Sequence, residues 1–249
     1  PRNAATLRAL EVQGRRMAAG TYRIRFHGRG GQGMKTASRI LGSAFFAAGF
    51  EVQDAPRYGA ERRGAPIFAY VRASRERIDE RGVIRCPDLV IVADDTLIPV
   101  PAAGVLAGIA PRTALLVASR DGPEVWQHRL NLQSPVLVLP ELAAAEDRAA
   151  QPLVGAACAG AAARLIGVIG RAAIEQAVAD ELGHLGAALV AQNREHALAG
   201  YAAMAERAGL VTPGVAADAN RWEPPAWIDL PFEDATVSAP VIHAALTSG

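Results

Sequence analysis

The 249-residue chain has only two cysteines, Cys86 and Cys158, and they lie far apart in the sequence. It has no Cys-x-x-Cys pair, so it offers no framework for a structural zinc ion or an iron–sulfur cluster. Free cysteines are usually buried and unreactive, and we interpret both as structural thiols. This usage predicts a reducing, cytoplasmic setting.

Long apolar runs and an excess of one charge sign are also lacking. No run of about eighteen apolar residues occurs, so no membrane-spanning helix is expected. The 26 basic and 25 acidic residues leave a net charge of +1, which indicates neither a nucleic acid nor a membrane as partner. No Gly-x-Ser-x-Gly, His-Glu-x-x-His or Walker motif is present, so we assign no catalytic residue and no metal ligand.

The most informative segment is a glycine-rich turn between an expected strand and an expected helix. Tyr22, Ile24 and Phe26 alternate with polar residues, as in a strand, and Thr36 to Phe46 is rich in helix formers. The glycines between them permit positive φ, and the N–H groups that open the helix favour an anion. Gly28, Gly30 and Gly33 also fit the dinucleotide fingerprint G-x-G-x-x-G.

Strand and helix patterns alternate along the rest of the chain. Further strands are expected over Glu51 to Ala55, Ile67 to Arg72, Asp88 to Asp94, Thr113 to Ser119 and Val136 to Leu139. Further helices are expected over Gly122 to Leu130, Val154 to Ile169, Ile174 to Leu182 and Leu185 to Ala208, and a helix broken by Pro99 and Pro101 is expected over Thr96 to Ile109. The alternation predicts an α/β fold with a doubly wound, mainly parallel sheet, a Rossmann-like first βα unit and a helical C-terminal part.

We divide the chain into three regions. Residues 1–20 are expected to form a short helical extension, and residues 21–208 the α/β domain. Residues 209–249 contain several prolines together with Trp222 and Trp227, which predicts an extended arm laid on a partner chain. An arm folded back on its own domain is the alternative.

A second motif follows the expected second strand. It reads Gly59-Ala60-Glu61-Arg62-Arg63-Gly64. Together with the first turn, Gly-Arg-Gly-Gly-Gln-Gly followed by Thr36-Ala37, it resembles the gamma subunit of the 2-oxoacid:acceptor oxidoreductases. The pyruvate:ferredoxin oxidoreductase group is the best known of these. The resemblance covers roughly residues 20 to 205.

The resemblance implies one subunit of a larger enzyme that is not active in isolation. Such a complex oxidatively decarboxylates a 2-oxoacid and joins the acyl group to coenzyme A, with electrons passing to ferredoxin or NAD. Thiamine diphosphate, Mg and iron–sulfur clusters are expected in partner subunits of alpha, beta and delta type. Three alternatives stay open: an aryl-2-oxoacid branch of indolepyruvate or phenylglyoxylate type, a self-sufficient NAD-binding dehydrogenase, and a pure assembly module.

Two groups of residues are the candidate site. The first group is expected at a cofactor or at a subunit interface, and it comprises Gly28, Arg29, Gly30, Gly31, Gln32, Gly33 and Thr36. The second group is expected at an interface, and it comprises Arg57, Tyr58, Glu61, Arg62, Arg63, Trp222 and Trp227. The arginines of the second group suit a phosphate or carboxylate, or an ion network with Glu61 and Asp54.

Four further polar residues have two interpretations each. Asp54 could bind a ribose hydroxyl if the first turn holds a dinucleotide. Asp94 and Asp95 end an expected strand, where they could meet a ligand, although a helix-capping role is favoured. His27 could act as a general base, but a core or interface histidine is favoured.

Overall fold

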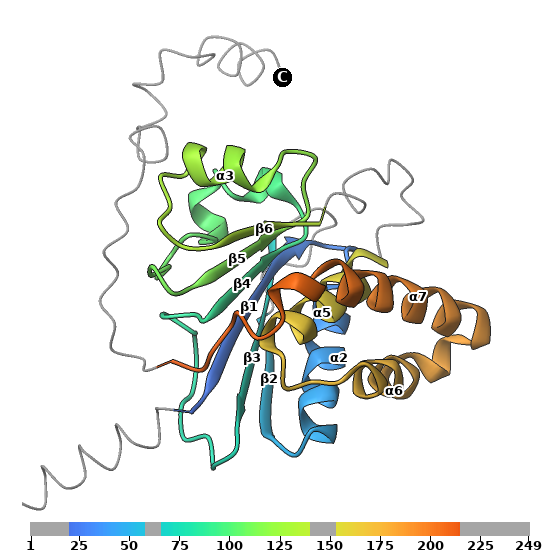
Figure 1. The fold of residues 1–249 in the computed structure, drawn as a ribbon. Helices are drawn as coiled ribbons and strands as arrows, with labels where there is room; N and C mark the ends of the chain where they lie inside the picture. The colour runs from blue at the N-terminus through green and yellow to red at the C-terminus, as the bar shows by residue number, and fades with distance from the viewer. Residues whose placement is uncertain (1–19, 58–65, 140–152, 215–249) are drawn as a thin grey trace, which may run out of the picture.

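The computed structural model of the chain describes residues 20–57, 66–139 and 153–214 (Figure 1). The expected N-terminal extension therefore lies outside the described residues. So do the second glycine motif, with Tyr58, Glu61, Arg62 and Arg63, and the part of the expected arm that holds Trp222 and Trp227.

A six-stranded sheet forms the centre of the fold, in the order β2-β3-β1-β4-β5-β6 (Figure 1). Its strands are β1 (Tyr22–Arg29), β2 (Glu51–Arg57), β3 (Pro66–Ser74), β4 (Leu89–Val92), β5 (Ala114–Val117) and β6 (Val136–Val138). β1, β4, β5 and β6 pair in parallel, whereas β3 runs antiparallel to both β1 and β2. The predicted mainly parallel α/β sheet is confirmed, with β3 as an antiparallel strand inside it.

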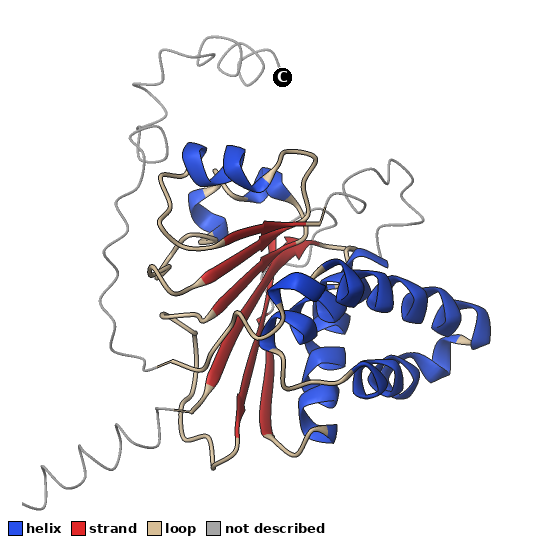
Figure 2. Ribbon diagram, viewed as in Figure 1, coloured by secondary structure: helices blue, strands red, loops and turns tan. Residues whose placement is uncertain are grey.

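Helices cover both faces of the sheet (Figure 2). One face carries α2 (Met34–Ala47), α5 (Leu153–Ile166), α6 (Arg171–Leu182) and α7 (Ala187–Ala203). The other face carries α3 (Pro123–Arg129) and the 3-10 turns η1 (Asp95–Leu97) and η2 (Pro101–Ala103). Alternate residues of β4 serve the two layers, because Leu89 and Ile91 lie in the first core and Val90 and Val92 in the second. Two more 3-10 turns, η3 (Gly183–Leu185) and η4 (Ala205–Arg207), flank α7.

The helix predicted over Thr96 to Ile109 is wrong. The segment folds as the two short turns η1 and η2. Pro99 and Pro101 have no backbone N–H to donate, and Gly104 and Gly108 adopt φ of 54° and 71°, which a continuing helix forbids. A Cβ at Gly108 would lie 1.6 Å from the carbonyl oxygen of Arg85, so the loop also passes close to a second backbone.

The predicted helical C-terminal part is confirmed, and small residues bring its helices together. α5 and α7 cross so closely that a Cβ at Gly160 would lie 1.8 Å from the carbonyl oxygen of Ala197. Reciprocally, a Cβ at Gly200 would lie 2.1 Å from the carbonyl oxygen of Ala157. The alanine- and glycine-rich composition of α5 is therefore explained by backbone-to-backbone packing.

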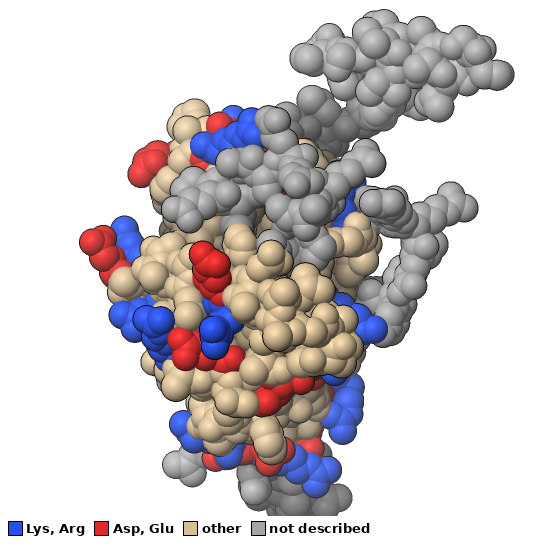
Figure 3. Space-filling model, turned by 90° about the vertical axis from the view of Figure 1, so that its right-hand side faces the viewer, with Lys and Arg blue, Asp and Glu red and all other residues tan. Residues whose placement is uncertain are grey.

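The helical face of the molecule has a mixed surface. Figure 3 shows acidic and basic side chains interspersed on it, without separation into two regions of opposite sign. Among the described residues, no helix is both long enough and apolar enough to cross a membrane.

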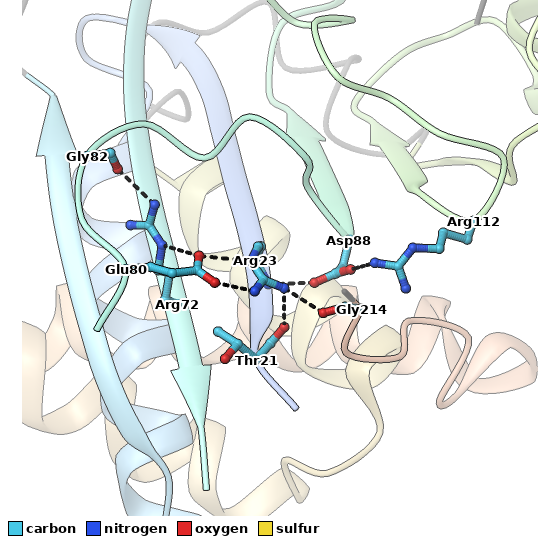
Figure 4. Close-up of polar contacts among 8 residues, drawn as sticks. All are labelled: Thr21, Arg23, Arg72, Glu80, Gly82, Asp88, Arg112 and Gly214. Atoms are coloured by element: carbon cyan, nitrogen blue, oxygen red, sulfur yellow. Dashed lines mark hydrogen bonds and ion pairs between the residues drawn. The ribbon is translucent and has the colours of Figure 1, made fainter. Parts of the chain in front are cut away.

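A buried ion network joins the amino ends of β1 and β4 (Figure 4). Arg23 and Arg72 lie opposite each other on neighbouring strands, are nearly inaccessible, and share the carboxylate of Glu80. Arg23 also donates a hydrogen bond of 2.6 Å to the carbonyl oxygen of Gly214. The first residues of the expected arm therefore pack into the domain, with Val211 buried and Gly214 bridged to Thr21, the residue before β1.

Asp88 is the second carboxylate of this network and is 2% exposed. It accepts the backbone N–H of Arg23 at 2.8 Å and the guanidinium of Arg112 at 2.6 Å. Burial raises the pKa of Asp88 to about 6, and these two donors oppose the rise without cancelling it.

We expect Asp88 to make the chain less stable at pH 7 than near pH 4. Its folded pKa of about 6 lies above an unfolded value of about 3.9. Its contribution is thus fully present below the unfolded pKa and is lost as the pH rises through the folded pKa. The loss amounts to about 3 kcal/mol. Urea unfolding of wild type and Asp88→Asn at several pH values measures it.

The comparison between the two chains isolates Asp88 from other groups. Glu80 makes the unfolding free energy rise with pH, because the hydrogen bond from Arg23 lowers its pKa. This contribution is the same in wild type and in Asp88→Asn. The difference in unfolding free energy should therefore change between about pH 4 and pH 6. A difference that is flat over this interval would contradict the expectation.

Candidate functional site

The glycine-rich turn lies at the carboxyl end of β1 and leads directly into α2. The turn closes with a hydrogen bond of 3.1 Å from the N–H of Gln32 to the carbonyl oxygen of Arg29. Gly31 and Gly33 adopt φ of 99° and 71°, so both positions require glycine. Gly28 is also restricted, because a Cβ there would lie 2.5 Å from Cγ of Met34.

The amino end of α2 faces the same edge of the sheet. Gly33 is its N-cap, no side chain caps the helix, and its first turn contains no acidic residue. The first N–H groups of a helix have no partner within it, and together with the helix dipole they favour an anion. Lys35 and Thr36, which stand in this first turn, are exposed and half-buried, respectively.

This turn lies between two adjacent parallel strands whose following segments pack on opposite faces of the sheet. β1 and β4 are adjacent and parallel, but α2 follows β1 on one face whereas η1 follows β4 on the other. In open α/β sheets, ligands bind outside the carboxyl ends of two such strands. The structure therefore places the predicted turn at the most favourable edge of the sheet for a ligand.

Polar contacts join the ends of β1 and β4 across this point. Arg29 Nε donates to Asp94 Oδ2 at 2.8 Å, and Arg29 Nη2 donates to Thr96 Oγ1 at 2.8 Å. Gln32 Nε2 reaches the same Asp94 oxygen at 3.4 Å, while Gln32 Oε1 accepts the backbone N–H of Arg29 at 2.7 Å. Asp94 also accepts the N–H of Thr96 at 3.0 Å, which confirms its predicted capping role.

Comparison with known proteins shows which family the chain belongs to. A family profile described as pyruvate ferredoxin/flavodoxin oxidoreductase matches residues 23–203. The chain belongs to this family. The common gamma subunit of the pyruvate/ketoisovalerate oxidoreductases of Pyrococcus furiosus is 35% identical over 165 residues, which cover 66% of this chain and 88% of that protein. The pyruvate synthase subunit PorC of Thermotoga maritima is 34% identical over 157 residues, which cover 63% and 80%.

Solved structures of the family share the fold. The crystal structure of the pyruvate oxidoreductase subunit PORC of Thermotoga maritima matches with a TM-score of 0.59 at 30% identity, covering 74% of this chain and 96% of that one. A 2-oxoglutarate:ferredoxin oxidoreductase of Magnetococcus marinus, with 2-oxoglutarate, coenzyme A and succinyl-CoA bound, matches at 0.58 and 22% identity, covering 84% and 34%. The chain is thus a gamma subunit of a pyruvate or 2-oxoacid:ferredoxin oxidoreductase, as the sequence motifs predicted.

Asp54 does not occupy the position of the ribose-binding acid in a Rossmann-type dinucleotide site. Its strand, β2, is separated from β1 by β3, which adds about 4.8 Å to the distance across the sheet. The Asp54 carboxylate instead accepts a hydrogen bond of 2.8 Å from Ser38 Oγ on α2. The interpretation of the glycine turn as a dinucleotide site is therefore disfavoured, because the ribose-binding acid normally follows the strand next to β1.

His27 is a buried histidine on the face opposite α2. It is 2% exposed, and its ring meets Phe68 edge-on with 5.3 Å between centroids. Burial lowers the pKa of His27 to about 3, with the positive charge of Arg25 adding to the effect. A neutral, inaccessible ring of this kind suits the core interpretation better than a general base.

The second group of predicted residues is placed only in part. β2 runs parallel to β1, so Arg57 at its carboxyl end lies at the same edge of the sheet as the glycine turn. The loop that follows Arg57 lies outside the described residues. Whether its arginines meet a partner stays a prediction.

Sequence reasoning missed a hollow of about 390 Å³ beside η1. Its walls come from η1 and α3, and its lining residues are Asp95, Thr96, Pro99, Asp121, Trp126 and Arg129. Asp95 accepts a hydrogen bond of 2.6 Å from Ser119, which also accepts the indole N–H of Trp126. The capping role predicted for Asp95 is wrong, because Asp94 is the N-cap of η1 and Asp95 is its first residue. The sequence carries no signal that places Trp126 near Asp95.

Proposed function

We propose that this gamma subunit completes the active site of a complex that converts a 2-oxoacid, coenzyme A and an oxidised electron carrier into an acyl-CoA, CO₂ and the reduced carrier. The family match over the whole sheet domain carries the proposal. We include coenzyme A as a co-substrate because the structure of the Magnetococcus marinus enzyme contains coenzyme A and succinyl-CoA. Ferredoxin or NAD would take the electrons.

The glycine turn would contribute by binding an anionic group of coenzyme A. The N–H groups that open α2 lie at the carboxyl edge of the sheet, and a Cβ at Gly31 would meet no atom within 4 Å, so a ligand could approach the backbone there. Arg29 and Gln32 form one side of this turn. The subunit would thereby position the co-substrate and shield it from water, without itself touching the reacting carbon.

The redox and carbanion chemistry would belong to partner subunits of alpha, beta and delta type. Thiamine diphosphate with Mg would supply an electron sink, and iron–sulfur clusters would carry the electrons. The cysteines of this chain do not fit an iron–sulfur cluster. Its two cysteines, Cys86 and Cys158, are too few for a cluster, and burial raises the pKa of Cys158 to about 12. Two free thiols also suit a cytoplasmic complex.

The chain should therefore purify as part of a hetero-oligomer. Native mass spectrometry of the complex, isolated through a tag on this chain, should show larger subunits bound at fixed stoichiometry. A tag on an unrelated protein from the same cells controls for adventitious binding. A stable homo-oligomer that oxidises 2-oxoacids without other subunits would sink the proposal, and it would favour the self-sufficient dehydrogenase.

A further inference from the structure

Asp94 is the centre of the polar contacts at the glycine turn. Its two carboxylate oxygens accept hydrogen bonds from the Arg29 guanidinium, from the Gln32 amide and from the backbone and hydroxyl of Thr96. The Asp94 side chain is 16% exposed and that of Arg29 is 34% exposed. The contact of 2.8 Å between them is thus partly shielded from water, where charge pairs act more strongly than on an open surface.

The position of Asp94 raises an electrostatic problem for the proposed function. A carboxylate at the carboxyl end of β4 stands beside the amino end of α2, where the anionic co-substrate would bind. An uncompensated negative charge there would repel that anion. Arg29 neutralises the charge of Asp94, because its Nε donates a hydrogen bond to the Asp94 carboxylate. Its Nη2 donates to Thr96 Oγ1 at 2.8 Å, which fixes the guanidinium in this position.

We infer that Arg29 and Asp94 act as a neutral pair that sets the charge of the turn. The inference rests on the proposed function. Asp94 is then a negative charge that Arg29 must compensate, and the side chains of Arg29 and Gln32 both donate to it. Arg29 serves mainly by neutralising Asp94, and not by contacting the ligand directly. This assignment differs from the simpler interpretation in which Arg29 pairs with a phosphate group.

A double-mutant cycle on the assembled complex separates the two interpretations. Arg29→Ala exposes the charge of Asp94 and should raise the Michaelis constant for coenzyme A about ten-fold. Asp94→Asn keeps the cap on η1, because asparagine caps as well as aspartate, and should change this constant less than about three-fold. The double variant removes both charges and should return to within about three-fold of wild type.

Two controls separate the effect of this pair from a general loss of surface charge and from a loss of stability. Arg171→Ala deletes an exposed ion pair with Glu175 on α6 and should leave the kinetic constants unchanged. Melting temperatures of the four chains of the cycle measure the pair independently of turnover. The loss in the double variant should be smaller than the sum of the two single losses.

Several results would overturn the inference. A double variant that keeps the full defect of Arg29→Ala means that Arg29 contacts the ligand itself. Melting temperatures whose changes simply add mean that the pair is not coupled. If all variants keep the wild-type Michaelis constant while coenzyme A is turned over, the glycine turn is not its binding site. That last result also removes the turn from the proposed function, whereas the first two leave the proposed function intact.

Discussion

Replacing Gly160 or Gly200 by leucine is expected to detach α7 from α5 and to unfold the domain. At both positions the added side chain would meet a backbone carbonyl of the other helix, at 1.8 Å and 2.1 Å from Cβ alone. Backbone cannot rotate away as a side chain can, so the helices must separate. We expect a loss of at least about 3 kcal/mol, the upper end of ordinary overpacking costs.

Urea unfolding of the purified chain, followed by circular dichroism, measures this loss. Gly183→Leu is the matched control, because Gly183 is exposed, has φ of −53° and has no atom near its missing Cβ. It should stay within about 0.5 kcal/mol of wild type. Midpoints for Gly160→Leu and Gly200→Leu that equal that of the control would show that α5 and α7 do not cross as described.

The first βα unit was predictable because its signals are local. Alternation over Tyr22 to Phe26, glycines and a run of helix formers each predict their own element, and together they predict the turn between them. The continuous apolar run of β4 likewise predicts a strand that is buried on both faces. Fold class followed from the order of such elements and needed no contact between distant residues.

The strand β3 was predicted over Ile67 to Arg72, but its antiparallel direction, which could have been predicted, was not. The connection from Arg57 to Pro66 is too short for a crossover, which needs a dozen residues or more, so β2 and β3 had to pair as a hairpin. This one strand changes the functional conclusion. It moves Asp54 away from β1 and removes the acid on which a dinucleotide site would depend.

The contacts between Arg29 and Asp94 could not be predicted from spacing. The two residues are 65 positions apart, and only the parallel pairing of β1 with β4 brings their strand ends together. Pattern reasoning identified each residue separately, one as part of a turn and the other as a cap. The ion pair between Arg29 and Asp94 decides whether the surface of the turn is positive or neutral. This pair depends on the tertiary fold and not on the local sequence.

This chain is expected to be required for 2-oxoacid oxidation but not to catalyse it alone. The direct test is to assemble the complex with and without it and to measure coenzyme A-dependent reduction of a viologen dye. Pyruvate and indolepyruvate as substrates distinguish the general from the aryl branch.

We expect omission of the chain to lower turnover at least about a hundred-fold, equivalent to about 2.7 kcal/mol of barrier. Adding back purified wild type or Gly183→Leu should restore it, whereas Gly160→Leu, whose domain is expected to be destabilised, should restore less of it. Full turnover without the chain, or turnover by the purified chain alone, would contradict the claim.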